Sequence, residues 1–211
     1  TGTTIKATEN SVITAVKTYF QDNLKKFGGV FRRSNLLAEI DNISPAILNS
    51  QAVVKLQQRF SPTLNVPTSY NIVFPVALQS ADDVNTIIET STFIFNNRIC
   101  SIKNKLNSTT LQVVNAGAGV EIDNVGEYVP ELGTLSLTGF NPTSITAGDD
   151  FLKISALPAN TSTIVPLRNY VLDLDEEPTF ASGIVDRQTQ TTSLGSGATA
   201  VSSTSSSSSS Y

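Results

Sequence analysis

Three residue types are missing from this chain, and each absence narrows what the chain can do. Its 211 residues include no histidine, no tryptophan and no methionine. Histidine is the commonest general base and metal ligand and the usual partner of a serine or cysteine nucleophile, so these catalytic designs are not expected. A natural reading frame begins with methionine. We therefore expect the sequence to be the C-terminal part of a larger polypeptide.

Cysteine is nearly absent as well, since Cys100 is the single thiol. One cysteine cannot form an internal disulfide. Cys100 lies in a strand-like stretch beside Ile99 and Ile102, and no base is near it in the sequence, which favours a small core residue over a nucleophile. We expect no enzymatic activity, no cofactor and no metal site.

Charge and long apolar runs are also scarce. Charged residues make up 15% of the chain, the net charge is −4, and no basic stripe with interleaved aromatic residues is visible, so we expect no nucleic-acid partner. No apolar run approaches the roughly 18 residues of a membrane span, and no signal peptide opens the chain, so no membrane partner is expected. The hydrophobic fraction of 39% is sufficient for a real core.

What the chain does contain near its start is an amphipathic helix pattern. From Ser11 onward, apolar side chains recur every three or four residues, at Val12, Val16, Phe20, Leu24 and Phe27. Asn10 or Ser11 can cap the start of this helix, and Gly28 fits the left-handed residue that ends one. Residues 1–10 are polar, and we expect them to be frayed.

A second, shorter helix pattern follows the pair Arg32 and Arg33. Ser34 can cap it, and its inward side chains are predicted to be Leu36, Leu37 and Ile40. The dipeptide Ser44–Pro45 makes continuation beyond residue 43 unfavourable.

Strand patterns fill most of the remaining chain. Residues 51–60 alternate between apolar and polar side chains, and residues 70–78 do the same with Pro75 favouring an edge position or a bulge. Residues 81–91 form a short helix or a loop, and Asn96–Asn97 suits a tight hairpin turn. The glycines of "NAGAGV" (residues 115–120) lack the lysine and hydroxyl residue of a phosphate loop and indicate another hairpin turn.

This order predicts the α+β class, with two N-terminal helices packed on a mainly antiparallel β-sheet. We expect a helix–helix–sheet unit over residues 1–107, a β-hairpin-rich region over 108–187 and an extended or flexible Ser-rich tail over 188–211. The tail has almost no large apolar side chain with which to offset its ordering entropy.

Two acidic runs are the strongest candidates for chemistry. Asp149 and Asp150 form one, and the second is "DLDEE", residues 173–177. Paired carboxylates could serve glycoside hydrolysis, and a cluster could bind calcium. Both runs follow strand patterns among turn residues, where acids cap turns and keep edges soluble, and this second interpretation is favoured.

Basic residues gather where the two helices meet. Lys25, Lys26, Arg32 and Arg33 could bind a phosphate or an acidic partner, although solvated cations at the end of a helix are the simpler interpretation. Arg32 and Arg33 are the better candidates for a salt bridge between subunits. Together with Tyr19 and Phe27, at the flanks of the first helix, they form the predicted protein interface.

The helix that ends in "FGG", followed by "RSNLLAEIDNI" and the strand within "NSQAVVKLQQRFSP", resembles the region shared by baseplate J-like proteins of contractile phage tails. Residues 120–175 are similar to the C-terminal part of the larger baseplate wedge subunit of T-even-like phages. The resemblance covers residues 11–185. It provides no catalytic residues that could be transferred to this chain.

The resemblance implies a structural subunit of the virion's tail baseplate, assembled in the host cytoplasm. Its C-terminal domain would pair with a second copy and join other wedge and hub proteins in a ring about the tail hub. No small-molecule substrate is implied.

Two other functions remain open. The Ser/Thr/Asn-rich strands suit a virion binding module for fibre attachment or carbohydrate, although 7% aromatic residues and no tryptophan are unfavourable for stacking on sugars. The acidic runs suit a carboxylate hydrolase.

Overall fold

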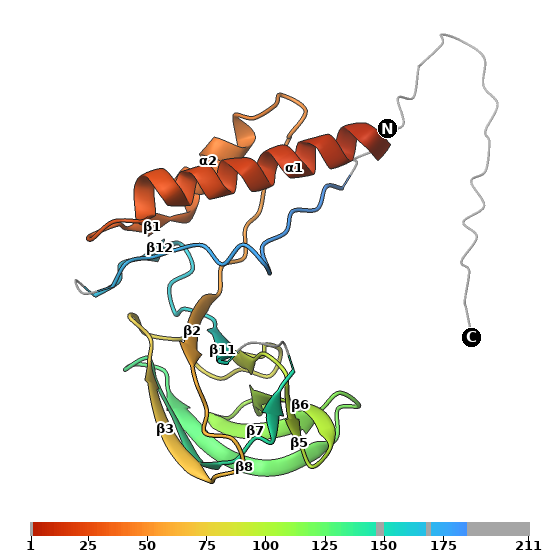
Figure 1. Ribbon diagram of the computed structural model, residues 1–211. Coiled ribbons are helices and arrows are strands. Elements are labelled where there is room, and N and C mark those ends of the chain that lie inside the picture. Colours follow the sequence, from red (N-terminus) through yellow and green to blue (C-terminus); the bar gives the residue numbers. More distant parts are fainter. Residues whose placement is uncertain (1, 147–149, 168–169, 185–211) are drawn as a thin grey trace, which may run out of the picture.

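The computed structural model describes residues 2–146, 150–167 and 170–184 (Figure 1). The helices lie together beyond one end of a large curved sheet, and extended segments connect the two parts. We call residues 2–47, with the two-stranded ribbon described below, the helical unit. Asp149 and the Ser-rich tail from residue 188 lie outside the described residues.

The first helix is longer than its apolar pattern. α1 spans Gly2–Tyr19 and continues without a break as a five-residue π-helix, η1, over Phe20–Leu24. The expectation of frayed residues 1–10, capped at Asn10 or Ser11, was therefore wrong over residues 2–10. Adding residues to a formed helix costs little, so a polar segment can extend the helix that the residues after Ser11 nucleate.

The end of this helix follows the sequence more closely. Gly28 adopts a φ of +75°, the left-handed conformation predicted for it. The second helix, α2, spans Arg33–Asp41 and buries Leu36 and Ile40, while Leu37 is half-buried. The prediction that Ser34 caps this helix was wrong, since Ser34 lies inside α2 and the N-cap is Arg32, which makes no side-chain cap hydrogen bond. The helix ends before Pro45, as the sequence indicated.

A short antiparallel ribbon accompanies the helices. β1 (Phe31–Arg32) pairs with β12 (Thr163–Ile164), so a segment from the far end of the chain completes the helical unit. The Phe31 ring packs against those of Tyr19 and Phe20, with centroids 6.4 and 6.0 Å away. These rings, with Leu24 and Ile164, form the small core of the helical unit.

The remaining strands form one ten-stranded antiparallel sheet in the path β2-β11-β4-β6-β7-β8-β9-β3, with β5 pairing to β6 and β10 to β5. Their bounds are β2 Leu56–Phe60, β3 Thr68–Val73, β4 Ile88–Thr90, β5 Phe93–Phe95, β6 Arg98–Asn104, β7 Thr110–Asn115, β8 Val120–Val129, β9 Thr134–Phe140, β10 Ser144–Ile145 and β11 Leu152–Ala156.

One turn prediction is confirmed, and two strands are shorter than predicted. Asn96 and Asn97 form the β5–β6 turn with φ values of 50° and 60°. The strand expected over residues 51–60 starts only at Leu56. β3 ends before Pro75 and carries a register shift near Thr68.

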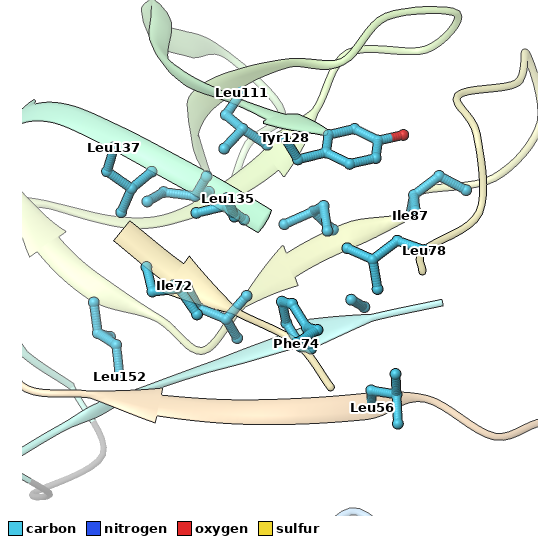
Figure 2. Close-up of a cluster of buried hydrophobic side chains, with 14 of the residues drawn as sticks. Leu56, Ile72, Phe74, Leu78, Ile87, Leu111, Tyr128, Leu135, Leu137 and Leu152 are labelled. Carbon is cyan, nitrogen blue, oxygen red and sulfur yellow. The ribbon is translucent and has the colours of Figure 1, made fainter. Parts of the chain in front are cut away.

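Residues 74–79 draw the two ends of the curved sheet together. The amide of Phe74 donates to the Gly133 carbonyl at 2.8 Å, in the β8–β9 turn, and Leu78 forms an isolated bridge with Pro158 beyond β11. The enclosed side chains form the main core (Figure 2), and its members include Ile72, Phe74, Leu78, Leu111, Tyr128, Leu135 and Leu152, all buried.

The α+β class is confirmed by two helices and many antiparallel strands. The helices pack on each other and on the β1–β12 ribbon rather than over the face of the ten-stranded sheet (Figure 1). The domain boundary expected at residue 107 falls inside the β6–β7 hairpin, across which the sheet is continuous.

Two glycines with nearly the same φ angle test whether residues 74–76 pack tightly against the β8–β9 turn. Gly133 and Gly139 have φ values of 63° and 64°, but a Cβ on Gly133 would lie 2.3 Å from the Val76 carbonyl oxygen, whereas one on Gly139 meets nothing within 4 Å. We predict that Gly139→Ala lowers the free energy of unfolding by roughly 1 kcal/mol, from backbone strain alone. Gly133→Ala should lower it by about 3 kcal/mol or more, in urea denaturation. Equal losses would show that the contact between this turn and residues 74–76 is not tight.

Candidate functional site

The C-terminal described segment, residues 170–184, forms no helix or strand. We call it the acidic arm because it contains the run Asp173–Glu177. It runs from beside the β1–β12 ribbon along α1 toward the N-terminus of that helix (Figure 1, blue). Near the end of the arm, the Gly183 amide donates to Glu9 Oε1 of α1 at 2.8 Å.

Four cations hold the acidic run, and they come from both parts of the molecule. From the helical unit, Lys17 Nζ lies 2.6 Å from Glu176 Oε2, and Lys25 Nζ lies 3.1 Å from Asp173 Oδ2. From the sheet, Arg59 of β2 lies 3.6 Å from Asp175 Oδ2, and Lys153 of β11 lies 3.2 Å from the same oxygen. Lys153 also pairs with Glu177. The arm therefore ties the helical unit to the sheet.

The sheet side of this contact is a pair of like charges. Lys153 and Arg59 are direct Cα partners in the β11–β2 ladder. Two cations directly opposite each other on neighbouring strands repel, which destabilises the pairing unless an anion lies between them. Asp175 supplies that anion. The Arg59 guanidinium also lies over the Phe151 ring, 4.9 Å from its centroid.

Asp175 is the most enclosed of these acids. Its side chain is 18% exposed and that of Lys153 is 16% exposed. Burial by itself would raise the pKa of Asp175, but the ammonium of Lys153 and the side chain of Gln57 beside the carboxylate outweigh it and lower that pKa below its ordinary value. The hydrogen bond to Glu177 raises the pKa of Lys153, against the effect of burial. Both shifts favour the charged forms.

This electrostatics argues against a hydrolytic role for the run at 173–177. A general acid at neutral pH needs a carboxyl whose pKa is raised, whereas the pKa of Asp175 is lowered. Asp173, Glu176 and Glu177 are each engaged with a lysine, and Asp150 is exposed. Within the described ranges, no three His, Cys, Asp or Glu side chains lie close enough together to hold a metal ion.

Cys100 is buried in β6, in agreement with the sequence prediction. Its Sγ lies 3.9 Å from the Phe95 carbonyl oxygen. Burial, together with the charge of Glu121, raises the pKa of the thiol and so disfavours the reactive thiolate.

The four residues of the predicted interface lie where the first helix ends and β1 begins. They lie at what we call the basic elbow, residues 25–33 with the adjoining ring of Tyr19. Phe27 is 76% exposed, Arg32 is exposed and Arg33 is half-buried. Tyr19 is 6% exposed, so its ring is not on the surface, and its hydroxyl donates to the Arg32 carbonyl at 3.3 Å. Tyr19 supports the elbow from inside. The interface itself stays a prediction.

The spacing of α1 contained the signal for Tyr19, which stands three residues after Val16 on the apolar face. The cations of the arm contact gave no comparable signal. Lys17, Arg59 and Lys153 are single charges in three distant elements, and only the tertiary fold brings them to one acidic run.

Two shallow grooves border the helices. One, of about 390 Å³, lies between α1 and the arm and is lined mainly by polar side chains, among them Lys17, Gln21, Lys25, Asp173 and Glu176. The other, of about 340 Å³, lies between α1 and α2. Small-molecule sites are predominantly apolar, so the composition of the first groove suits a seam between packed segments better than a ligand pocket.

Residues 2–59 match the family model described as baseplate structural protein gp6, C-terminal domain III. None of the curated proteins matches the chain. The matched segment is just over a quarter of the chain. It contains the helical unit except the ribbon strand β12, and it extends into β2, so it includes Lys17, Lys25 and Arg59. The match supports a phage baseplate structural protein; it is not a match to the baseplate J-like family. In the part of the chain that the structure describes, no helix is both long and apolar enough to cross a membrane.

The lowered pKa of Asp175 makes its contribution dependent on pH. A carboxyl whose pKa is lower in the folded state stabilises the fold above its unfolded pKa of about 3.9 and loses that effect as the pH falls through the folded value. We predict that Asp175→Asn lowers the free energy of unfolding by roughly 1–3 kcal/mol at pH 7. The difference from wild type should shrink toward zero in urea titrations repeated below pH 4. A difference that does not change with pH would contradict the ion pair.

The anchoring of the arm can be measured by proteolysis after Glu176, since the bond after Glu177 precedes Pro178 and resists cleavage. Lys153→Met removes the lysine that holds both Asp175 and Glu177, so a glutamate-specific protease should cleave the arm several-fold faster. Lys55→Met is the matched control, because Lys55 lies directly before β2 and its ion-pair partner, 3.9 Å away, is Glu89 of β4 rather than an acid of the arm. Equal cleavage of both variants would mean that Lys153 does not anchor the arm.

Proposed function

We propose that this chain is a structural subunit of a phage tail baseplate wedge, and that it mediates self-association and ring assembly around the tail hub. The observation that carries the proposal is the match of residues 2–59 to a family model of a baseplate structural protein. The matched residues build the helical unit, so this unit is the part of the chain to which the assembly role is assigned.

The basic elbow has the composition of an interaction surface. Phe27 projects from the turn after the helix, and Arg32 is exposed on the adjoining strand. Aromatic and arginine side chains are the residues on which protein interfaces most often depend. The hydrogen bond from Tyr19 and the ribbon pairing of β1 hold the backbone beneath them, so that little ordering entropy would be lost on binding.

Further apolar side chains lie exposed on two segments next to the helical unit. Leu48 and Val53 lie on the segment that leads to β2, and Val165 and Leu167 lie on the segment that leads from β12 to the arm. Exposed apolar side chains concentrated on one part of a protein are typical of interaction sites. They suit partners of two kinds, a second copy of the chain and the neighbouring wedge and hub proteins. The site of action is the tail baseplate of the virion, after assembly in the host cytoplasm.

Charge placed on the elbow should weaken self-association. We predict that Phe27→Asp raises the dissociation constant tenfold or more in sedimentation velocity runs over a concentration series, because it replaces an aromatic anchor by an anion. Leu132→Asp is the control, since Leu132 is 68% exposed in the β8–β9 turn of the sheet and lies outside the helical unit.

The proposal fails if the wild-type chain is strictly monomeric at high concentration and also binds no other baseplate protein. If the chain does associate and the two variants weaken it equally, the elbow is not the interface.

A further inference from the structure

The acidic arm is attached to the rest of the chain almost wholly through side chains. Among the described residues, the backbone hydrogen bonds of the arm are local, from Tyr170 to Leu167 at 2.9 Å and from Thr179 to Glu176 at 3.3 Å. Its contacts with the rest of the chain include five ion pairs, the bond between Gly183 and Glu9, and the half-buried Leu172, which packs against the hydrophobic core. Four of the five ion pairs include at least one exposed side chain, and only the pair of Lys153 and Asp175 joins two enclosed ones. Ion pairs with exposed groups are individually weak, so such an arm can leave its binding site without unfolding a helix or a sheet.

The surface that receives the arm is built without it. We call Lys17, Lys25, Arg59 and Lys153 the cationic seat. Arg59 and Lys153 are held opposite each other by the β2–β11 ladder, and Lys17 is fixed on α1. Without the arm, the like charges of Arg59 and Lys153 would face each other with no anion between them. The seat therefore requires an anion, whether from the same chain or from another.

The connection before the arm is long enough to reach a neighbour. Residues 165–172 separate Ile164, fixed in the ribbon, from Asp173, the first acid of the run. Nine peptide steps span up to about 30 Å when extended. Within a single chain, moreover, Phe180 and Ile184 of the arm remain 82% and 98% exposed. Within one chain, the helical unit and the sheet leave these two apolar side chains uncovered.

We propose that the acidic arm of one copy occupies the cationic seat of a second copy, in a reciprocal exchange that forms a two-fold pair. Each seat then receives the same acids that it holds within a single chain, so exchange sacrifices no contact and is favoured as concentration rises. The second body lies beside the exchanged arm and covers its apolar side chains. The inference rests on the self-association proposed above but uses a different surface from the basic elbow.

Charge reversal in two separate full-length chains tests the exchange. Lys153→Glu damages the seat and leaves the arm intact, whereas Asp175→Lys damages the arm and leaves the seat intact. Each variant alone has a mismatched seat and arm. In a mixture, the intact arm of the first chain meets the intact seat of the second, and the two reversed charges also attract each other.

The measurement is native mass spectrometry of the two chains, distinguished by an isotopic label, alone and mixed. We expect at least tenfold more mixed dimer than homodimer of either variant. A third chain, with Lys17→Glu and Glu176→Lys together, restores the pairing within one chain and should form dimers like wild type, because these two side chains have no other ion-pair partner among the described residues. Because Lys153 and Asp175 are mostly enclosed, the exposed pair Lys17→Glu and Glu176→Lys serves as a second set if either of the first variants fails to fold.

Mixed dimers no more abundant than the homodimers, with the doubly substituted chain behaving as wild type, would overturn the proposal and show that each arm stays on its own body. The elbow experiment separates this result from a failure of the proposed function. If Phe27→Asp weakens self-association but mixing the two charge-reversal variants yields no extra mixed dimer, the proposed function stands and the arm exchange is rejected.

Discussion

The arrangement of this molecule depends on two positive charges that face each other across a β-ladder. Lys153 of β11 and Arg59 of β2 are Cα partners, and their repulsion is relieved by one carboxylate, Asp175. That carboxylate lies on a segment without regular structure whose neighbouring acids pair with lysines of the first helix. A local requirement of the sheet therefore places the C-terminal arm across the helical unit. Ion pairs that are individually weak stabilise the contact more when they lie on one short segment, because each pair that forms lowers the ordering entropy lost by the next.

This arrangement suits a structural subunit. The helical unit has a small core of its own, in which Phe31 and Leu24 are buried together with Ile164 from the far end of the chain. Such a unit depends on neighbours for stability, and here they are the ribbon strand β12, the arm and, as we propose, other subunits. The acids that a sequence search identifies as candidates for catalysis instead hold two parts of the molecule together. The lowered pKa of Asp175 and the raised pKa of Lys153 keep both charged at neutral pH.

Local features of this fold were predictable because local physics determines them. Gly28 ends the first helix, Leu36 and Ile40 lie inward on the second, and Asn96–Asn97 makes a hairpin, each from backbone preference or periodicity. The helical state of residues 2–10 was missed because it depends on propagation from the residues that follow. Tyr19 was assigned to the surface although its spacing indicated burial. The partners of Asp173–Glu177 could not be predicted, because Lys17 and Lys153 lie 136 positions apart (153 − 17) and only the sheet and its connections bring them together.

Residual dipolar couplings can show whether the arm fixes the helical unit relative to the sheet. Alignment tensors can be fitted separately to amides of α1 and α2 and to amides of β6–β9, in the full chain and in one that ends at residue 169. We expect one common tensor in the full chain. After truncation we expect two different tensors, because the ion pairs to Lys17, Lys25, Arg59 and Lys153 are then lost. A common tensor after truncation would contradict the fixing role of the arm, and would show that the ribbon and the connecting segments alone hold the two parts in place.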